Sequence, residues 1–245
     1  MGKPVLTLGR AAVSERQITL EGGLQAQNFA GRGCMVAVCS LNLSAPCPWT
    51  RLPKNYNPRP PHAAFLRRPC LGNAAGAATI GAMLRELDAF QRAASPETGR
   101  VSGEGQASYG ELESWLGSVV PASARVERIC EIGLNRGESA VAWLCTFSAQ
   151  YVGFDLAQYN VSLDAARFLR RAFPGRFRLV VGNSIATLPS WAVAHPASCD
   201  VVSVDGGHHF VEALSDLSYA RLMARDGAAV VMDDTRCTTW WCKPP

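Results

Sequence analysis

One ten-residue stretch constrains the fold of this 245-residue chain more than any other feature. Residues 130–139 read C-E-I-G-L-N-R-G-E-S, after an apolar run and before a helix-like segment. Gly133 and Gly137 permit backbone positions that a Cβ would block. The start of a helix also offers unpaired N–H groups to an anion. The stretch therefore predicts a strand, a ligand-binding turn and a helix that begins beside the ligand. The competing interpretation is an ordinary glycine turn.

After residue 121 the chain alternates short apolar segments with segments of helical periodicity. We expect strands at residues 126–132, 151–154, 177–181, 201–204 and 228–232, with helices at 138–147, 162–173, 185–193 and 211–224. Such alternation is typical of a parallel sheet covered by helices on both faces. The predicted fold class is α/β, a Rossmann-like doubly wound parallel sheet. Ligands of these sheets bind beyond the carboxyl ends of the strands.

The sequence divides into three parts. Residues 1–72 are rich in proline and basic, with nine Lys or Arg against two acids, and predict an irregular extension. That segment is either a disordered extension, a start placed too early, or an organelle transit segment. Residues 73–120 predict a helical lead-in, with helices at 74–94 and 109–120. Residues 121–245 predict the sheet domain, in which twelve basic and twelve acidic side chains balance.

Nine cysteines raise the question of disulfides or a metal site. No C-x-x-C pair occurs, which argues against structural zinc. Cys130 and Cys145 fall in a predicted strand and helix, where a free thiol packs as a small apolar side chain. We therefore expect reduced thiols.

Each predicted strand ends in polar groups that can bind a ligand. Because the strands are parallel, these groups share one edge of the sheet. The candidates for binding a cofactor are Glu131, Gly133, Gly137, Ser139, Asp155, Asn183, Ser184 and Asp205.

Three of these candidates suggest specific contacts with a nucleoside. The Asp155 carboxylate can accept hydrogen bonds from both ribose hydroxyls, although Asp is also a common helix N-cap. Ser139 lies in the first turn of its helix, where a carboxylate of the ligand would bind. Ser184 could contact the adenine edge.

Asp205, Asp233 and Asp234 predict a metal site. Three converging carboxylates repel one another unless a cation lies between them. Oxygen ligands favour Mg²⁺. The alternative is that Asp233 caps a turn and Asp234 is solvated. His208 follows Asp205 by three residues and is the candidate catalytic base, whereas His209 is a candidate cap for the next helix.

Taken together, residues 121–235 resemble class I S-adenosylmethionine-dependent methyltransferases. The E-I-G-L-N-R-G-E-S loop is similar to the family's first motif, and Asp155 matches its ribose acid. The runs F-R-L-V-V-G-N-S, C-D-V-V-S-V-D-G-G-H-H and A-A-V-V-M-D-D-T resemble the metal-dependent O-methyltransferases of the catechol and macrocin types. This resemblance implies S-adenosyl-L-methionine as cofactor and Mg²⁺ held by Asp205, Asp233 and Asp234. Catechol enzymes place a Lys base where this chain has His208, and macrocin-type enzymes use an Asp where it has Gly207.

The family sheet has seven strands, and its last two follow the metal-binding acids. This sequence ends eleven residues after Asp234. We therefore expect a sheet that stops at its fifth strand, lacks the C-terminal strand pair and exposes an edge.

The resemblance implies an enzyme that transfers a methyl group to a hydroxyl of a small molecule with metal assistance. The alternative is a truncated, non-catalytic remnant that binds the cofactor without turnover. The absence of G-x-G-x-x-G argues against a nicotinamide-dependent oxidoreductase. We expect no nucleic-acid partner, because the basic extension lacks regular aromatic spacing. No apolar run is long enough to span a membrane. The expected location is the cytoplasm, or a plastid or mitochondrion if residues 1–72 are a transit peptide. The methyl acceptor and the oligomeric state are left open.

Overall fold

A computed structural model describes residues 63–95 and 125–233, together with the backbone of five short strands before them. These strands are β1 (Val13–Ser14), β2 (Gln17–Leu20), β3 (Leu24–Gln27), β4 (Met35–Cys39) and β5 (Trp49–Arg51). The predicted helix at residues 109–120 and Asp234 lie outside the described residues.

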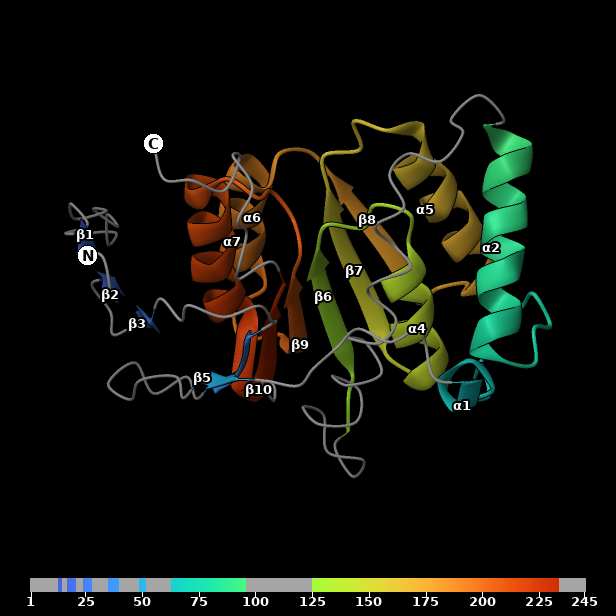
Figure 1. Ribbon diagram of the computed structural model, residues 1–245, viewed down its shortest axis with the longest axis horizontal. Helices are drawn as coiled ribbons and strands as arrows, with labels where there is room; N and C mark the ends of the chain where they lie inside the picture. The colour runs from blue at the N-terminus through green and yellow to red at the C-terminus, as the bar shows by residue number, and fades with distance from the viewer. Residues whose placement is uncertain are drawn as a thin grey trace.

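Five parallel strands form the centre of the sheet (Figure 1). They are β6 (Arg128–Ile132), β7 (Gln150–Asp155), β8 (Phe177–Val181), β9 (Cys199–Val204) and β10 (Ala224–Met232). Their order across the sheet is β10-β9-β6-β7-β8, so the first parallel strand, β6, lies in the middle and the later strands are added on both sides of it. The predicted doubly wound α/β fold is confirmed, and every predicted strand is present within a few residues of its expected bounds.

Helices cover both faces of this sheet. They are α1 (Ala63–Leu66), α2 (Ile80–Ala94), α4 (Glu138–Thr146), α5 (Asn160–Ala172), α6 (Ser184–Ala194) and α7 (Phe210–Met223). One buried cluster joins the sheet to α2, α4 and α5, and a second joins it to α6 and α7. The inner strands β6, β7 and β9 are thus buried on both faces, which explains their largely apolar sequences, whereas the edge strand β8 alternates between buried and exposed residues.

The N-terminal region extends the sheet beyond the fifth parallel strand. β4 pairs with β10 in antiparallel register from Met35↔Met232 to Cys39↔Ala228, and β5 pairs with β4. The full order is β5-β4-β10-β9-β6-β7-β8. The expectation of an exposed edge beside the fifth strand is therefore wrong, since strands that precede the domain in sequence occupy that edge. Periodicity could not reveal this pairing because the partners on β4 and β10 are far apart in the sequence.

Two disulfides among the described residues correct the expectation of free thiols. Cys130 on β6 is bonded to Cys199 on the neighbouring strand β9, and Cys70 is bonded to Cys145 near the end of α4. The pairs are separated by 69 and 75 residues, so a search for closely spaced cysteines misses them. Each disulfide joins segments that only the fold brings together.

Among the described residues, no helix is long and apolar enough to cross a membrane.

Candidate functional site at the carboxyl edge of the sheet

The glycine loop connects β6 to α4 as the sequence predicts. Gly133 has φ +96° and Gly137 has φ +77°, both in the region that favours glycine. Gly133 also packs against the turn after β9, where a Cβ would collide with the backbone carbonyl of Asp205. Gly133 thus lets two strand-end turns touch each other. That requirement is distinct from the predicted close approach to a ligand.

Gly137 is the N-cap residue of α4 and, having no side chain, makes no side-chain capping hydrogen bond. The first-turn N–H groups of α4 therefore face the loop without a side-chain cap. A Cβ on Gly137 would lie 2.9 Å from the Cβ of Ala165 on α5. This glycine is required both for the left-handed turn and for the contact between α4 and α5.

Asp155 ends β7 and holds the glycine loop. Its Oδ2 accepts hydrogen bonds from the N–H groups of Leu134 (2.8 Å) and Asn135 (2.9 Å), and its Oδ1 accepts one from Ala157 (2.6 Å). The carboxylate lies at the predicted edge of the sheet. Its role toward a ribose stays a prediction. The structure adds a second role, since Asp155 orders the loop itself.

Glu131 is buried under the loop, with 1% of its surface exposed. Its carboxylate accepts hydrogen bonds from Ser139 Oγ (2.8 Å) and from the Tyr151 hydroxyl. Burial raises the pKa of Glu131 to about 7, although these hydrogen bonds oppose the rise. Burial also raises the pKa of Tyr151 well above its ordinary value, and the neighbouring Glu131 adds to the effect.

The structure therefore places Glu131 and Ser139 together, but beneath the loop and bonded to each other. Tyr151 was missed from the sequence because it lies at the amino end of an apolar strand. The requirement that a buried acid have a hydrogen-bond donor was the signal available for it.

The predicted adenine side lies at the start of α6. Asn183 is the N-cap residue of this helix, and its Oδ1 accepts a hydrogen bond from the Ile185 N–H at 2.9 Å. Ser184 is the first helical residue. Asp216, from α7, is fully buried below the turn that follows β9, and burial raises its pKa to about 6. Nothing in the sequence pattern of α7 singled out Asp216.

Asp205 and Asp233 lie at adjacent strand ends. The Asp205 N–H donates to the carbonyl of Ile132 (2.8 Å), and the Asp233 N–H donates to that of Val204 (3.0 Å). Asp205 is exposed and Asp233 is half-buried. Within residues 65–95 and 125–233, no group of three or more His, Cys, Asp or Glu side chains is arranged to hold a metal ion. Because Asp234 is outside the described residues, the predicted three-carboxylate site stays a prediction.

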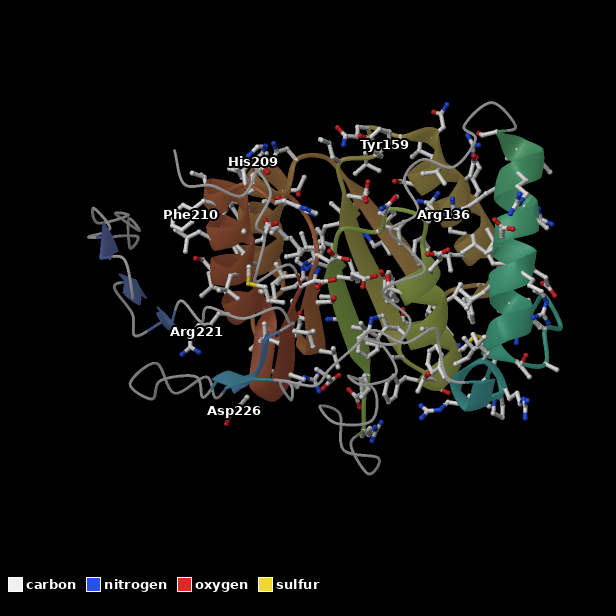
Figure 2. The ribbon with its side chains drawn as sticks, in the orientation of Figure 1. Arg136, Tyr159, His209, Phe210, Arg221 and Asp226 are labelled. Atoms are coloured by element: carbon white, nitrogen blue, oxygen red, sulfur yellow. A yellow bond between two sulfur atoms is a disulfide. The ribbon has the colours of Figure 1, made fainter. Side chains whose placement is uncertain are left out.

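His208 is exposed in the turn between β9 and α7. His209 occupies the N-cap position of α7 but makes no side-chain capping hydrogen bond. Figure 2 shows His209 at the same edge of the sheet as Tyr159, which occupies the N-cap position of α5 without a side-chain capping hydrogen bond. The turns after β7 and β9 thus face the same region, as a ligand at this edge requires.

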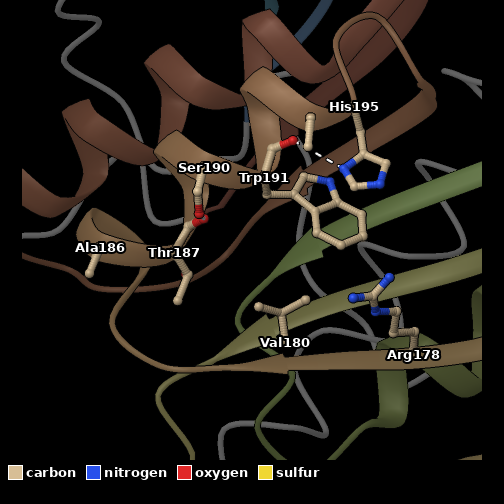
Figure 3. A pocket seen from close by; sticks show the side chains of 8 residues that line it. Arg178, Val180, Ala186, Thr187, Ser190, Trp191 and His195 are labelled. Carbon is tan, nitrogen blue, oxygen red and sulfur yellow. Dashed lines mark hydrogen bonds between the residues drawn. The ribbon is translucent and has the colours of Figure 1, made fainter.

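A separate pocket of about 290 Å³ lies between β8 and α6 (Figure 3). The Arg178 guanidinium carbon is 4.7 Å from the ring centre of Trp191, whose ring stacks on that of His195 at 3.9 Å. Its lining includes none of the predicted site residues. The pocket is therefore distinct from the strand-end site.

A winding sheet with a glycine turn after its central strand and an acid after the next defines a nucleoside-cofactor fold of the Rossmann-like class. Residues 130–235 match the family model described as a methyltransferase domain. This match confirms the prediction of a methyltransferase domain in the second half of the chain. No match was found among curated proteins.

Solved structures similar to the chain include three with bound cofactor. Cofactor-bound Rv0187 from MTB is 24% identical with a TM-score of 0.46, and the match covers 72% of this chain and 73% of that one. The O-methyltransferase TomG from Streptomyces achromogenes, in complex with SAM, is 21% identical with a TM-score of 0.45, covering 61% and 64%. SAH-bound PaMTH1 from Podospora anserina is 16% identical with a TM-score of 0.45, covering 62% and 61%. These TM-scores are below 0.5, so the assignment rests on the domain match.

Proposed function

We propose that this protein transfers the methyl group of S-adenosylmethionine to a hydroxyl of a small molecule, with assistance from a divalent metal ion. The observation that carries the proposal is the junction of the glycine loop with Asp155 within the matched domain. In this arrangement the Asp155 carboxylate, which would accept from a ribose, lies near the first turn of α4, which would receive an anion. A nucleoside with an anionic tail has both of the groups that this pair of features would bind.

The cofactor would lie along this edge. The Asp155 carboxylate would accept a hydrogen bond from the ribose, and the first turn of α4 would receive the carboxylate of the methionine part. Asn183 and Ser184 would contact the adenine side. These residues mainly bind and orient the cofactor, and positioning is a large part of catalysis in a displacement between two bound reactants.

The acceptor hydroxyl would attack the methyl carbon in line with the departing sulfur. A bond forms between the acceptor oxygen and the methyl carbon, the bond from that carbon to sulfur breaks, and the sulfur leaves with the bonding electrons as a thioether. His208 is the candidate to take the hydroxyl proton. Asp205, Asp233 and Asp234 would hold Mg²⁺, whose chemistry is to lower the pKa of the acceptor hydroxyl.

Calorimetry with S-adenosylhomocysteine, with and without Mg²⁺, tests the cofactor and metal parts separately. We expect cofactor binding that Asp155→Ala weakens by roughly tenfold or more. Mg²⁺ binding should be lost in the Asp205→Asn, Asp233→Asn double variant. Failure of the folded protein to bind the cofactor would refute the proposal.

Transfer to a panel of hydroxylated acceptors tests the reaction. Methyl transfer that requires Mg²⁺ and falls in His208→Ala supports the proposed enzyme. Cofactor binding without transfer to any acceptor would instead support the alternative, a non-catalytic remnant that binds the cofactor.

A further inference from the structure

Helix α2 lies outside the matched methyltransferase domain and contacts its cofactor loop. α2 packs against α4 and α5, and its buried side includes Gln91, which is 5% exposed. The Gln91 Nε2 donates to the carbonyl oxygen of Arg136 at 2.9 Å and approaches that of Val161 at 3.5 Å. A single side chain of α2 thus reaches both the glycine loop and the start of α5.

The orientation of the Gln91 amide follows from these neighbours. Two carbonyl oxygens can only accept hydrogen bonds, so the NH₂ group must face them. The Gln91 Oε1 is buried and has no hydrogen-bond partner among the described residues. An unpartnered buried oxygen is costly. An apolar side chain would avoid that cost, so the donor toward Arg136 is the feature that distinguishes Gln91 from an ordinary core residue.

Helix α2 also contacts the side chain of Arg136. Its guanidinium is 3.2 Å from Asp88 of α2 and 3.6 Å from Glu138 at the start of α4. Only 22% of the Arg136 side chain is exposed. Figure 2 shows Arg136 on the side of the sheet that α2 covers. Both the carbonyl and the side chain of this loop residue are therefore fixed from α2.

The next residue is Gly137, the left-handed N-cap of α4. The orientation of the 136–137 peptide fixes the Gly137 N–H, which donates to the Leu134 carbonyl at 2.8 Å. Rotation of this peptide would turn the loop and redirect the first N–H groups of α4. Those N–H groups are the ones that the proposed function assigns to the anionic part of the cofactor.

We propose that Gln91 is a positioning residue for the cofactor loop, because its amide fixes the Arg136 carbonyl and thereby aims the start of α4 at the cofactor. This role rests on the proposed function for its consequence in binding, and on the hydrogen bond itself for its effect on the loop. Gln91 acts through Arg136 and Gly137, without contact with the reacting atoms.

The test uses two substitutions of Gln91 and a control on the same helix. Gln91→Met keeps the length of the side chain and removes the donor. Gln91→Glu can donate only when its carboxyl is protonated, and burial favours that form. Met83→Ala creates a cavity under α2 two helical turns away, at a fully buried position, and leaves the Gln91 amide in place.

Hydrogen exchange of the protein without cofactor gives the first readout. We expect faster exchange at residues 134–139 in Gln91→Met than in Met83→Ala, when the two are compared at equal loss of thermal stability. Equal exchange in the two variants would overturn the proposal. This readout needs no cofactor, so it stands even if the proposed function fails.

Calorimetry with S-adenosylhomocysteine gives the second readout. Gln91→Met should weaken binding roughly three- to tenfold, and Met83→Ala should leave the affinity of the folded protein unchanged. Gln91→Glu should bind with nearly wild-type affinity at low pH and more weakly as pH rises, relative to the wild type at each pH. Wild-type affinity in both Gln91 variants across this range would overturn the proposal. Failure of the wild type to bind would refute the proposed function, and hydrogen exchange would then decide the role of Gln91.

Discussion

The carboxylate of Asp155 and the backbone N–H of Leu134 are joined by a 2.8 Å hydrogen bond that ties the end of β7 to the glycine loop. The same carboxylate accepts from Asn135 and Ala157. A carboxylate offers about four lone-pair positions, and three are occupied here. Asp155 can therefore accept one ribose hydroxyl without releasing the loop, and accepting both would require a loop hydrogen bond to break.

The one remaining acceptor position of Asp155 predicts that removing one ribose hydroxyl weakens binding much more than removing the other. One of the analogues 2′-deoxy- and 3′-deoxy-S-adenosylhomocysteine should bind roughly tenfold more weakly than the parent, and the other should lose much less. Calorimetry on the wild type and on Asp155→Asn measures both losses. Equal large losses for the two analogues would show that the loop releases Asp155 on binding.

Asp200 provides a matched control for substitutions of Asp155. Its Oδ2 also accepts from two backbone N–H groups, those of Glu127 (2.7 Å) and Arg128 (2.8 Å), but at the opposite end of the sheet. Asp200→Asn and Asp155→Asn should each lower the free energy of unfolding by about 1–3 kcal/mol. Only Asp155→Asn should weaken cofactor binding. A similar loss of affinity in Asp200→Asn would mean that general stability, and not the loop, controls binding.

The buried Glu131 predicts a pH dependence of stability. Its pKa is about 7 in the folded protein against an ordinary 4.5, so folding favours the protonated form. The stability contributed by this group is present below pH 4.5 and is lost as pH rises through 7, by roughly 3 kcal/mol. Glu131→Gln should remove this loss. Denaturant unfolding from pH 4 to 8 measures it as the difference between wild type and variant.

Asp216→Asn is the control for that measurement. The pKa of Asp216 is raised from 3.8 to about 6. Asp216→Asn should therefore change the pH dependence of the free energy of unfolding at lower pH than Glu131→Gln does. Superimposable pH profiles for wild type and Glu131→Gln would contradict the assignment of a raised pKa to Glu131.

The sequence predicted those features of the fold that depend on residues close together in the chain. The glycine loop, the acid at Asp155 and the parallel strands were all readable because each depends on neighbours in sequence. The hydrogen bonds of Gln91 and Tyr151 were not, since each joins residues 20 to 70 positions apart. The pairing of β4 with β10 was hidden for the same reason, as its partners lie about 190 positions apart. The hydrogen bonds from Leu134 and Asn135 to Asp155 also show that a residue singled out by its place after a strand can make contacts that the local pattern does not reveal.

The two disulfides predict which thiols resist modification. In the unfolded but unreduced protein, Cys70, Cys130, Cys145 and Cys199 should not react with an alkylating reagent, and peptide mapping should recover the pairs 70–145 and 130–199. Reduction should lower the melting temperature, because bridges that close loops of this length stabilise by up to about 4 kcal/mol each. Alkylation of all four side chains without a reductant would contradict the pairing.

The pairing of β4 with β10 predicts that a backbone substitution far from the site destabilises the sheet. Ala37 pairs with Val230 on one side and with Trp49 of β5 on the other. Ala37→Pro removes an N–H from this ladder and should lower the free energy of unfolding by about 2–3 kcal/mol. Ala37→Ser keeps the N–H and is the control, so the two variants should differ clearly in thermal unfolding. Loss of the pairing should also expose the edge of β10 and promote aggregation, which light scattering would detect. Equal stability of the two variants would show that β4 does not hold this edge of the sheet.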